Sequence, residues 1–232
     1  MPGRGCLIAI CGIDGSGKTV QTAMLCRRAQ EAGWLVRSIE FPRYGEGFFG
    51  PLIARYLRGD FAKDPAQVSP YLAALPFACD RWEAGPTLRR WLEDGALVVC
   101  NRYVAANLAH QGGKIQSPQE RAGFLRWVEK LEYEVFALPL PDLQVWLDMP
   151  PEVAVKLIAC KKRHGQLEEA RDIHESSLAH LEATRAVYHQ LASATTGWAT
   201  VKCASEGQPL PPERIAEELW RRVKPLLDSR AR

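Results

Sequence analysis

The chain has 232 residues, of which 47% are hydrophobic, 25% charged and 9% aromatic. This globular composition excludes disorder, collagen and coiled coil as the main architecture, and the length suits one α/β domain with a buried core. Thirty basic and 27 acidic residues leave a formal charge of +3. That charge is too small for a surface built to bind nucleic acid, so any anion site must be local.

The apolar and cysteine-containing segments exclude several other classes. No apolar run approaches the roughly 18 residues of a membrane span, and the N-terminus lacks the pattern of a signal peptide. We therefore expect a cytoplasmic protein with no membrane partner. None of the seven cysteines forms a CxxC pair, so neither a disulfide framework nor a zinc site is indicated. We expect four thiols to be small buried hydrophobes: Cys6, Cys11, Cys100 and Cys203.

Strands and helices are expected to alternate along the chain. A helix is predicted over residues 20–32 and an amphipathic one over 213–227, and short apolar runs predict strands over residues 6–11, 35–41, 97–100, 143–147 and 199–203. Such alternation favours a parallel sheet with helices on both faces. No repeat or linker divides the chain, so we predict a single domain over residues 1–232, a three-layer α/β sandwich with a five-stranded parallel sheet.

A glycine-rich motif lies between the first strand and the first helix. It fits the eight-position P-loop pattern, and its predicted ATP-binding residues are Gly12, Asp14, Gly15, Ser16, Gly17, Lys18 and Thr19. Glycines let backbone N–H groups turn toward phosphate oxygens, and the helix N-terminus favours an anion. Lys18 is expected to reach the β and γ phosphates, and Thr19 to offer its hydroxyl to magnesium. GTPases, ATPases and small kinases share this P-loop NTPase motif, so it leaves the phosphate acceptor open.

Four further segments carry a resemblance to a known family. They are residues 41–44 (Phe-Pro-Arg-Tyr), 77–81, 101–107 and the basic stretch 161–175. With the P-loop, in this order and spacing, they resemble the thymidylate kinase family of P-loop nucleoside monophosphate kinases. The resemblance extends to about residue 192. It implies transfer of the γ-phosphate of ATP to dTMP, giving dTDP and ADP, with Mg²⁺ accompanying ATP.

The resemblance also implies an acceptor pocket. Arg43, at the end of the second strand, is expected to present its guanidinium to a phosphate, although a loop arginine is also often merely solvated. Phe77 and Arg81 lie four apart on a predicted helix and share a face, so the ring can stack on thymine while the arginine contacts the nucleotide. A helical phenylalanine is equally typical of a core. The implied dTMP-binding residues are Asp14, Phe41, Arg43, Tyr44, Phe77, Arg81, Asn101, Arg102, Asn107, His110 and Gln111.

Asn101 departs from the family, most of whose members have aspartate near magnesium at this position. An amide carries no negative charge for the metal. Either Thr19 and water suffice for the metal, or another acid such as Asp14 or Asp80 contributes.

The helix that follows Asn101 carries the expected base and sugar contacts. In relatives, the equivalent of Asn107 bonds the thymine edge. His110 replaces a residue that is often tyrosine beside the sugar, which leaves the rejection of ribonucleotides open. Gln111 is a second candidate for base recognition, or else a solvated polar residue.

Position 15 is glycine, where some family members carry an arginine, so another cation must face the transferring phosphoryl group. The polar segment around residues 159–172 is predicted to be a mobile lid that supplies it, with the candidates Lys161, Lys162, Arg163 and Arg171. A solvated charge run is the alternative. Arg163 is our first choice, and the predicted catalytic residues are Lys18, Arg102 and Arg163.

Several alternatives stay open. A deoxynucleoside kinase would phosphorylate a free 5′-hydroxyl, with a carboxylate base such as Glu40. Another nucleoside monophosphate kinase would share most of these segments, and a non-catalytic module would bind nucleotide alone. Family members are commonly homodimers, and an apolar face over residues 124–131 could serve as the interface or be buried within the chain.

Overall fold

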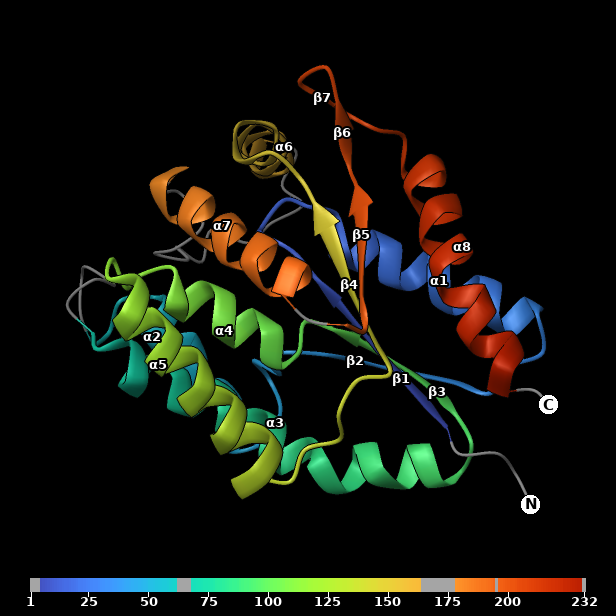
Figure 1. Ribbon diagram of the computed structural model, residues 1–232, viewed down its shortest axis with the longest axis horizontal. Coiled ribbons are helices and arrows are strands. Elements are labelled where there is room, and N and C mark those ends of the chain that lie inside the picture. The colour runs from blue at the N-terminus through green and yellow to red at the C-terminus, as the bar shows by residue number, and fades with distance from the viewer. Residues whose placement is uncertain (1–4, 62–67, 164–177, 195, 231–232) are drawn as a thin grey trace.

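The computed structural model describes residues 5–61, 68–163, 178–194 and 196–230, in which a parallel sheet lies between two layers of helices (Figure 1). The sheet has five strands in the order β2-β3-β1-β4-β5, and every neighbouring pair is parallel. Its strands are β1 (Cys6–Cys11), β2 (Val36–Glu40), β3 (Leu97–Asn101), β4 (Leu143–Asp148) and β5 (Trp198–Lys202). The predicted α/β fold with a five-stranded parallel sheet is therefore confirmed, with strand ends within about one residue of those expected.

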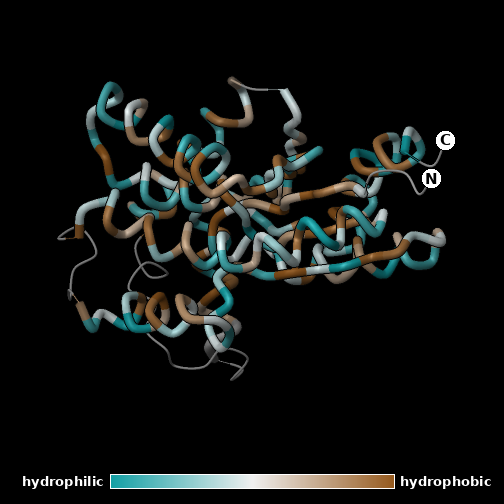
Figure 2. Tube along the Cα trace, turned by 90° about the horizontal axis from the view of Figure 1, so that it is seen from below, coloured by the Kyte–Doolittle hydropathy of each residue, from teal (hydrophilic) through white to brown (hydrophobic). Residues whose placement is uncertain are grey.

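Burial along the strands follows their place in the sheet. Every residue of β1 and β3 is buried, because helices cover both faces of these inner strands. The edge strands β2 and β5 keep exposed positions. In Figure 2 hydrophobic stretches follow the extended strands between the helices. The main core packs on these strands, with Leu7, Ile8, Ile10, Leu97 and Leu147 among its fully buried members.

Helices form the two outer layers. In Figure 1, α1 and α8 cover one face of the sheet, whereas α3, α4 and α7 lie on the other. The helices are α1 (Lys18–Glu31), α2 (Gly50–Leu57), α3 (Pro70–Glu93), α4 (Val104–Gly112), α5 (Pro118–Glu129), the π-helix η2 (Lys130–Val135), α6 (Pro151–Arg163), α7 (Leu178–Ala194) and α8 (Pro212–Arg230). A small hairpin of β6 (Ala204–Ser205) and β7 (Gln208–Pro209) precedes α8. Within the described ranges, no helix combines the length and apolar character needed to cross a membrane.

The apolar face predicted over residues 124–131 is occupied within the chain. Phe124, Leu125 and Val128 of α5 are buried in the main core. The Phe124 ring contacts Tyr71 edge-on, with a centroid distance of 5.2 Å. Intramolecular packing therefore accounts for these side chains.

The four thiols predicted to be small hydrophobes, Cys6, Cys11, Cys100 and Cys203, are free and buried. Burial raises the pKa of Cys6, Cys11 and Cys203 to about 12. These thiols therefore stay protonated and act as packing groups.

Parallel pairing brings the carboxyl ends of β1, β2 and β3 to one edge of the sheet. Glu40 of β2 is the register partner of Asn101 in β3, which in turn pairs with Ile10 of β1. The loops that leave these strands carry the P-loop, residues 41–44 and residues 102–103, and Asn101 ends β3 itself. Ligands of open α/β sheets bind at this edge.

Candidate active site

The P-loop turns on glycines whose backbone conformation excludes most side chains. Gly15 has φ +79°, and a Cβ there would lie 2.7 Å from the Ala154 carbonyl oxygen. Gly17 has φ +88° and is the N-cap of α1, which carries no side-chain cap. A Cβ on Gly17 would meet nothing within 4 Å. The space beside this N-cap is therefore open, which is compatible with an anion at the helix N-terminus.

The polar groups inside this loop suit a phosphate. Lys18 Nζ donates to the carbonyl oxygens of Gly12 at 3.0 Å and Ile13 at 2.7 Å. Burial, followed by the charge of Arg102, lowers the pKa of Lys18 to about 7. Ser16 Oγ is buried without a hydrogen-bond partner in the described part of the chain. A bound phosphate would give the lysine a counter-charge and the serine an acceptor.

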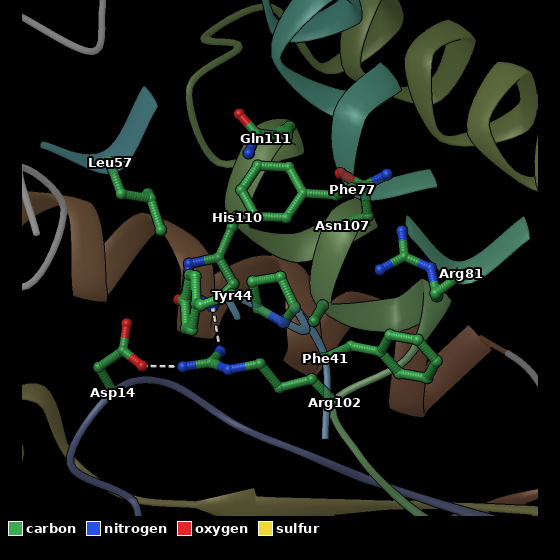
Figure 3. Close-up of a pocket in the computed structure, with 12 residues that line it drawn as sticks. Asp14, Phe41, Tyr44, Leu57, Phe77, Arg81, Arg102, Asn107, His110 and Gln111 are labelled. Atoms are coloured by element: carbon green, nitrogen blue, oxygen red, sulfur yellow. Dashed lines mark hydrogen bonds and ion pairs between the residues drawn. The ribbon is translucent and has the colours of Figure 1, made fainter. Parts of the chain in front are cut away.

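Asp14 and Arg102 join the P-loop to the end of β3. Arg102 Nη2 donates to Asp14 Oδ1 (Figure 3). Lys18 Nζ lies 3.7 Å from the same oxygen. Burial alone would raise the pKa of Asp14, but the charges of Arg102 and Lys18 outweigh it and hold the pKa well below its usual value. Arg102 has φ +65°, a left-handed conformation that is rare for a side chain of this size.

A pocket opens beside this ion pair. Figure 3 shows the aromatic rings, the amides and the two arginines around it. Its lining includes all the predicted dTMP-binding residues except Arg43 and Asn101, together with Pro42, Leu57 and Ala106. The structure thus brings together side chains from the P-loop, the end of β2, α3 and α4.

The Phe77 ring is half-buried at the wall of this pocket. It packs edge-on against Tyr56, with centroids 6.2 Å apart. Both residues belong to a small apolar cluster between α2 and α3, separate from the main core. The predicted stacking platform therefore has a fixed support behind it.

Arg81 is anchored by a glutamate that sequence reasoning missed. Its Nε and Nη2 atoms donate to the two carboxylate oxygens of Glu132 at 2.5 and 2.7 Å. Glu132 is fully buried in η2. The two charge-assisted hydrogen bonds offset the free-energy cost of burying the two charges. Glu132 is one of three glutamates in residues 129–134, and no local pattern distinguishes it, because its partner lies 51 positions away.

The same carboxylate orients Asn107. Asn107 Nδ2 donates to Glu132 Oε1 at 2.9 Å and to the Ala74 carbonyl at 3.1 Å. Because both neighbours accept, Nδ2 must face them, and the Oδ1 atom is left buried and without a partner in the described residues. Gln111 Oε1 is likewise unpartnered there. The inner end of the pocket therefore offers hydrogen-bond acceptors.

Arg43 differs from its predicted orientation. Its guanidinium donates to Asp80 Oδ1 at 2.9 Å, to the Asp80 carbonyl at 3.0 Å and to Glu83 Oε2 at 2.8 Å. The acids of α3 therefore hold this arginine, and it is absent from the pocket lining. Asp80 is fully buried beneath it, so it is not available as the alternative metal acid.

Asn101 lies between the P-loop and β2. Its Nδ2 atom donates to Thr19 Oγ1 at 3.2 Å and to Glu40 Oε1 at 2.7 Å. Thr19 and Glu40 are exposed, whereas Asn101 is buried. A glutamate considered only as a base for a rival reaction thus lies beside the residues expected to face magnesium.

The predicted lid lies mostly beyond the described residues. Lys161, Lys162 and Arg163 end the backbone of α6, but their side chains and all of Arg171 lie outside the description. Their roles stay predictions, as does the lid segment of residues 159–172.

Comparisons with known proteins agree on one family. A family model described as thymidylate kinase matches residues 10–209. A thymidylate kinase of Mycobacterium tuberculosis is 32% identical over 220 residues, which cover 92% of this chain and 96% of that protein. A probable thymidylate kinase of Pyrococcus abyssi is 34% identical over 167 residues, 72% of this chain and 74% of the relative.

The fold agrees with these sequence matches. The solved structure of thymidylate kinase from Candida albicans aligns with a TM-score of 0.72, over 97% of this chain and 93% of that chain. At 21% sequence identity this likeness supports the fold alone. The sequence matches carry the assignment, and the chain belongs to the thymidylate kinase family.

Proposed function

We propose that this protein transfers the γ-phosphate of ATP to dTMP, giving dTDP and ADP. The observation that carries the proposal is the contact between Asp14 and Arg102, which joins a P-loop to a pocket lined by Phe77 and Asn107. A donor site and an acceptor site thus share one ion pair. A module that only bound nucleotide would have no need of the second pocket.

Positioning and charge neutralisation carry the transfer. Lys18 binds the β and γ phosphates of ATP, and Arg102 binds the phosphate of dTMP, so that donor and acceptor lie in line. The acceptor phosphate is already ionised at neutral pH, and little general-base work is needed. We assign the remaining cation at the transferring group to Arg163 of the predicted lid, with Lys161, Lys162 and Arg171 as the other candidates.

The groups expected to face magnesium suit an ion that arrives with ATP. Thr19 offers an exposed hydroxyl, and Asn101 Oδ1 is buried without a partner in the described residues. Magnesium keeps several water ligands when it binds with nucleotide phosphates, and it neutralises charge on the β and γ oxygens. Thr19 would be its protein ligand, and the Asn101 oxygen would accept from one of its waters.

The pocket's acceptors support a pyrimidine that carries an N–H group. Thymine has a donor at N3, which matches the unpartnered Asn107 Oδ1. Cytosine has an acceptor at the same ring position and would leave this buried oxygen unsatisfied. The Phe77 ring would stack on the base.

A panel of acceptors tests the proposal. Purified protein is supplied with ATP-Mg and, separately, with dTMP, dUMP, dCMP, dGMP, UMP or thymidine, and products are separated by chromatography. We expect dTDP from dTMP as the main product. Phosphorylation of thymidine but not dTMP would establish a deoxynucleoside kinase instead, and no product at enzyme excess would leave a binding module. A cytoplasmic location and a homodimer stay predictions.

A further inference from the structure

Asn101 connects two oxygen groups at the carboxyl edge of the sheet. Its Nδ2 atom lies 2.7 Å from Glu40 Oε1 and 3.2 Å from Thr19 Oγ1. The first contact follows from strand register, because Glu40 and Asn101 are opposite residues of β2 and β3. The glutamate is therefore held two hydrogen bonds away from the P-loop hydroxyl.

The orientation of this amide follows from chemistry. An ionised carboxylate only accepts, so Asn101 must direct its NH₂ group toward Glu40. The Oδ1 atom then points elsewhere, and it is buried with no hydrogen-bond partner among the described residues. Only 3% of Asn101 is exposed. A buried amide oxygen of this kind calls for a donor such as water.

The neighbouring acids are already engaged. Asp14 is paired with Arg102 and lies 3.7 Å from Lys18 Nζ. Asp80 is fully buried against Arg43. Among the described residues, no cluster of three His, Cys, Asp or Glu side chains could hold a metal by itself. Glu40 is exposed and bonded to the amide beside Thr19.

We propose that Glu40 supplies the negative charge for the magnesium ion that accompanies ATP. It accepts hydrogen bonds from the metal's water ligands, and Asn101 fixes it beside Thr19. The inference rests on the proposed function, in which ATP brings this ion to the P-loop. Glu40 is a positioning residue, since it acts on the ion through water.

The arrangement places the carboxylate on β2 and the amide on β3. Partners of metal-bound groups typically change metal affinity by about 10- to 100-fold when they are removed. Charge also predicts opposite effects on two kinds of binding. Glu40 repels a metal-free triphosphate and attracts the metal ion. Neutralising Glu40 should therefore strengthen binding of the metal-free triphosphate and weaken binding of the metal ion.

Manganese binding provides the test, because Mn²⁺ can be counted by electron paramagnetic resonance without any turnover. The protein is saturated with a non-hydrolysable ATP analogue, titrated with Mn²⁺, and compared with E40Q and the double variant E40Q/N101D. Analogue binding is measured separately in EDTA. Glu46→Gln, at an exposed glutamate in the loop after β2, is the matched control.

We expect E40Q to weaken Mn²⁺ binding about tenfold while metal-free analogue binding stays equal or becomes tighter. The introduced glutamine can still accept from Asn101, so the fold is preserved. In E40Q/N101D the glutamine donates to the new aspartate and the charge returns on β3. This variant should recover Mn²⁺ affinity to within about threefold of the original protein, and E46Q should change neither affinity.

Three results would overturn the inference: unchanged Mn²⁺ affinity in E40Q, a double variant as weak as E40Q, or weaker metal-free analogue binding in E40Q. The first of these results, together with a thymidine kinase activity that the unmodified protein has and E40Q lacks, would identify Glu40 as a catalytic base instead. The titration contains no acceptor, so it is independent of whether dTMP is the substrate. Failure of the proposed function would instead appear as absence of dTDP from the unmodified protein.

Discussion

Arg102 Nη1 lies 3.2 Å from His110 Nε2. A guanidinium only donates, so His110 Nε2 must accept, and the ring is neutral with its proton on Nδ1. That nitrogen lies 3.4 Å from His180 Nε2, which must accept in turn. Two neutral imidazoles on α4 and α7 therefore extend from the arginine that we assign to the acceptor phosphate.

This histidine pair should make stability depend on pH. Burial lowers the pKa of His110 well below its usual value, and burial with the charge of Lys114 lowers the pKa of His180 to about 4. The unfolded chain takes up protons near pH 6.5 while the folded chain does not. Stability is thus complete above about pH 6.5 and falls as the pH drops toward about 4, by up to about 1.4 kcal/mol per pH unit for each histidine.

Urea unfolding between about pH 4.5 and 7.5 measures this slope. His180→Gln keeps an acceptor for His110 but removes one titrating group, so the slope below about pH 6.5 should become shallower. His189→Gln, on an exposed position of α7, removes a histidine outside this pair and is the matched comparison. If stability depends on pH with the same slope in His180→Gln as in the unmodified protein, the two histidines are not both neutral in the folded chain.

The P-loop lysine should be essential for turnover but not for folding. Lys18→Ala removes the cation expected on the β and γ phosphates, and we expect kcat to fall by about a thousandfold. A coupled assay for ADP measures the loss, and circular dichroism checks the fold. Lys156→Ala, at an exposed lysine of α6, should keep full activity. Turnover close to that of the unmodified protein in Lys18→Ala would refute the role.

Two glycines that flank α1 allow the effect on phosphate binding to be distinguished from the effect of backbone strain. Gly17 and Gly33 flank the helix with φ +88° and +87°, and a Cβ on either would meet nothing within 4 Å. Replacement by alanine should therefore destabilise both variants similarly, by about 1 kcal/mol. Gly17→Ala fills the space before the helix N-terminus and should also lose ATP affinity, whereas Gly33→Ala should not.

Thermal unfolding and calorimetric titration with ATP distinguish these effects. The prediction is wrong if both variants bind ATP equally well, because the space before Gly17 would then not be a phosphate site.

The buried Arg81–Glu132 pair should be costly to break but replaceable by apolar side chains. Glu132→Gln leaves the arginine buried without a counter-charge and should destabilise the protein by about 3–5 kcal/mol. The double variant Arg81→Met/Glu132→Met removes both charges and should recover most of that stability. The KM of this double variant for dTMP should nevertheless be higher than that of the unmodified protein, since Asn107 loses the carboxylate that orients it.

Guanidinium unfolding and steady-state kinetics report the two effects. Asp228→Asn breaks the exposed pair with Lys224, whose atoms lie 2.5 Å apart, and should cost less than about 1 kcal/mol. A double variant as unstable as Glu132→Gln would show that packing rather than charge dominates.

Local sequence patterns were sufficient to predict the strands and the P-loop but not the long-range side-chain pairs. The apolar run of β1 and the glycines of the P-loop act through neighbouring residues, so their structure is readable along the chain. Glu132 and Glu40 act through partners that only the folded sheet and helices bring close, namely Arg81 and Asn101.

Arg43 shows that a correctly predicted position does not determine the partners of a side chain. Its position after β2 was predicted correctly, but the direction of its guanidinium depends on two acids of α3, Asp80 and Glu83. No pattern around residue 43 specifies those acids. The position of a side chain on the sheet edge is thus more predictable than the group that it binds.

The carboxylate of Asp14 forms ion pairs with a cation of each proposed substrate site, Lys18 on one side and Arg102 on the other. Filling either site changes the field that this carboxylate and its two partners impose on the other. With Lys18 at the donor and Arg102 at the acceptor, as we propose, the two affinities should be interdependent, and by thermodynamic reciprocity each nucleotide should alter the dissociation constant of the other by the same factor. An inhibitor of the acceptor pocket would therefore have a potency that varies with the concentration of ATP, even though it never enters the P-loop.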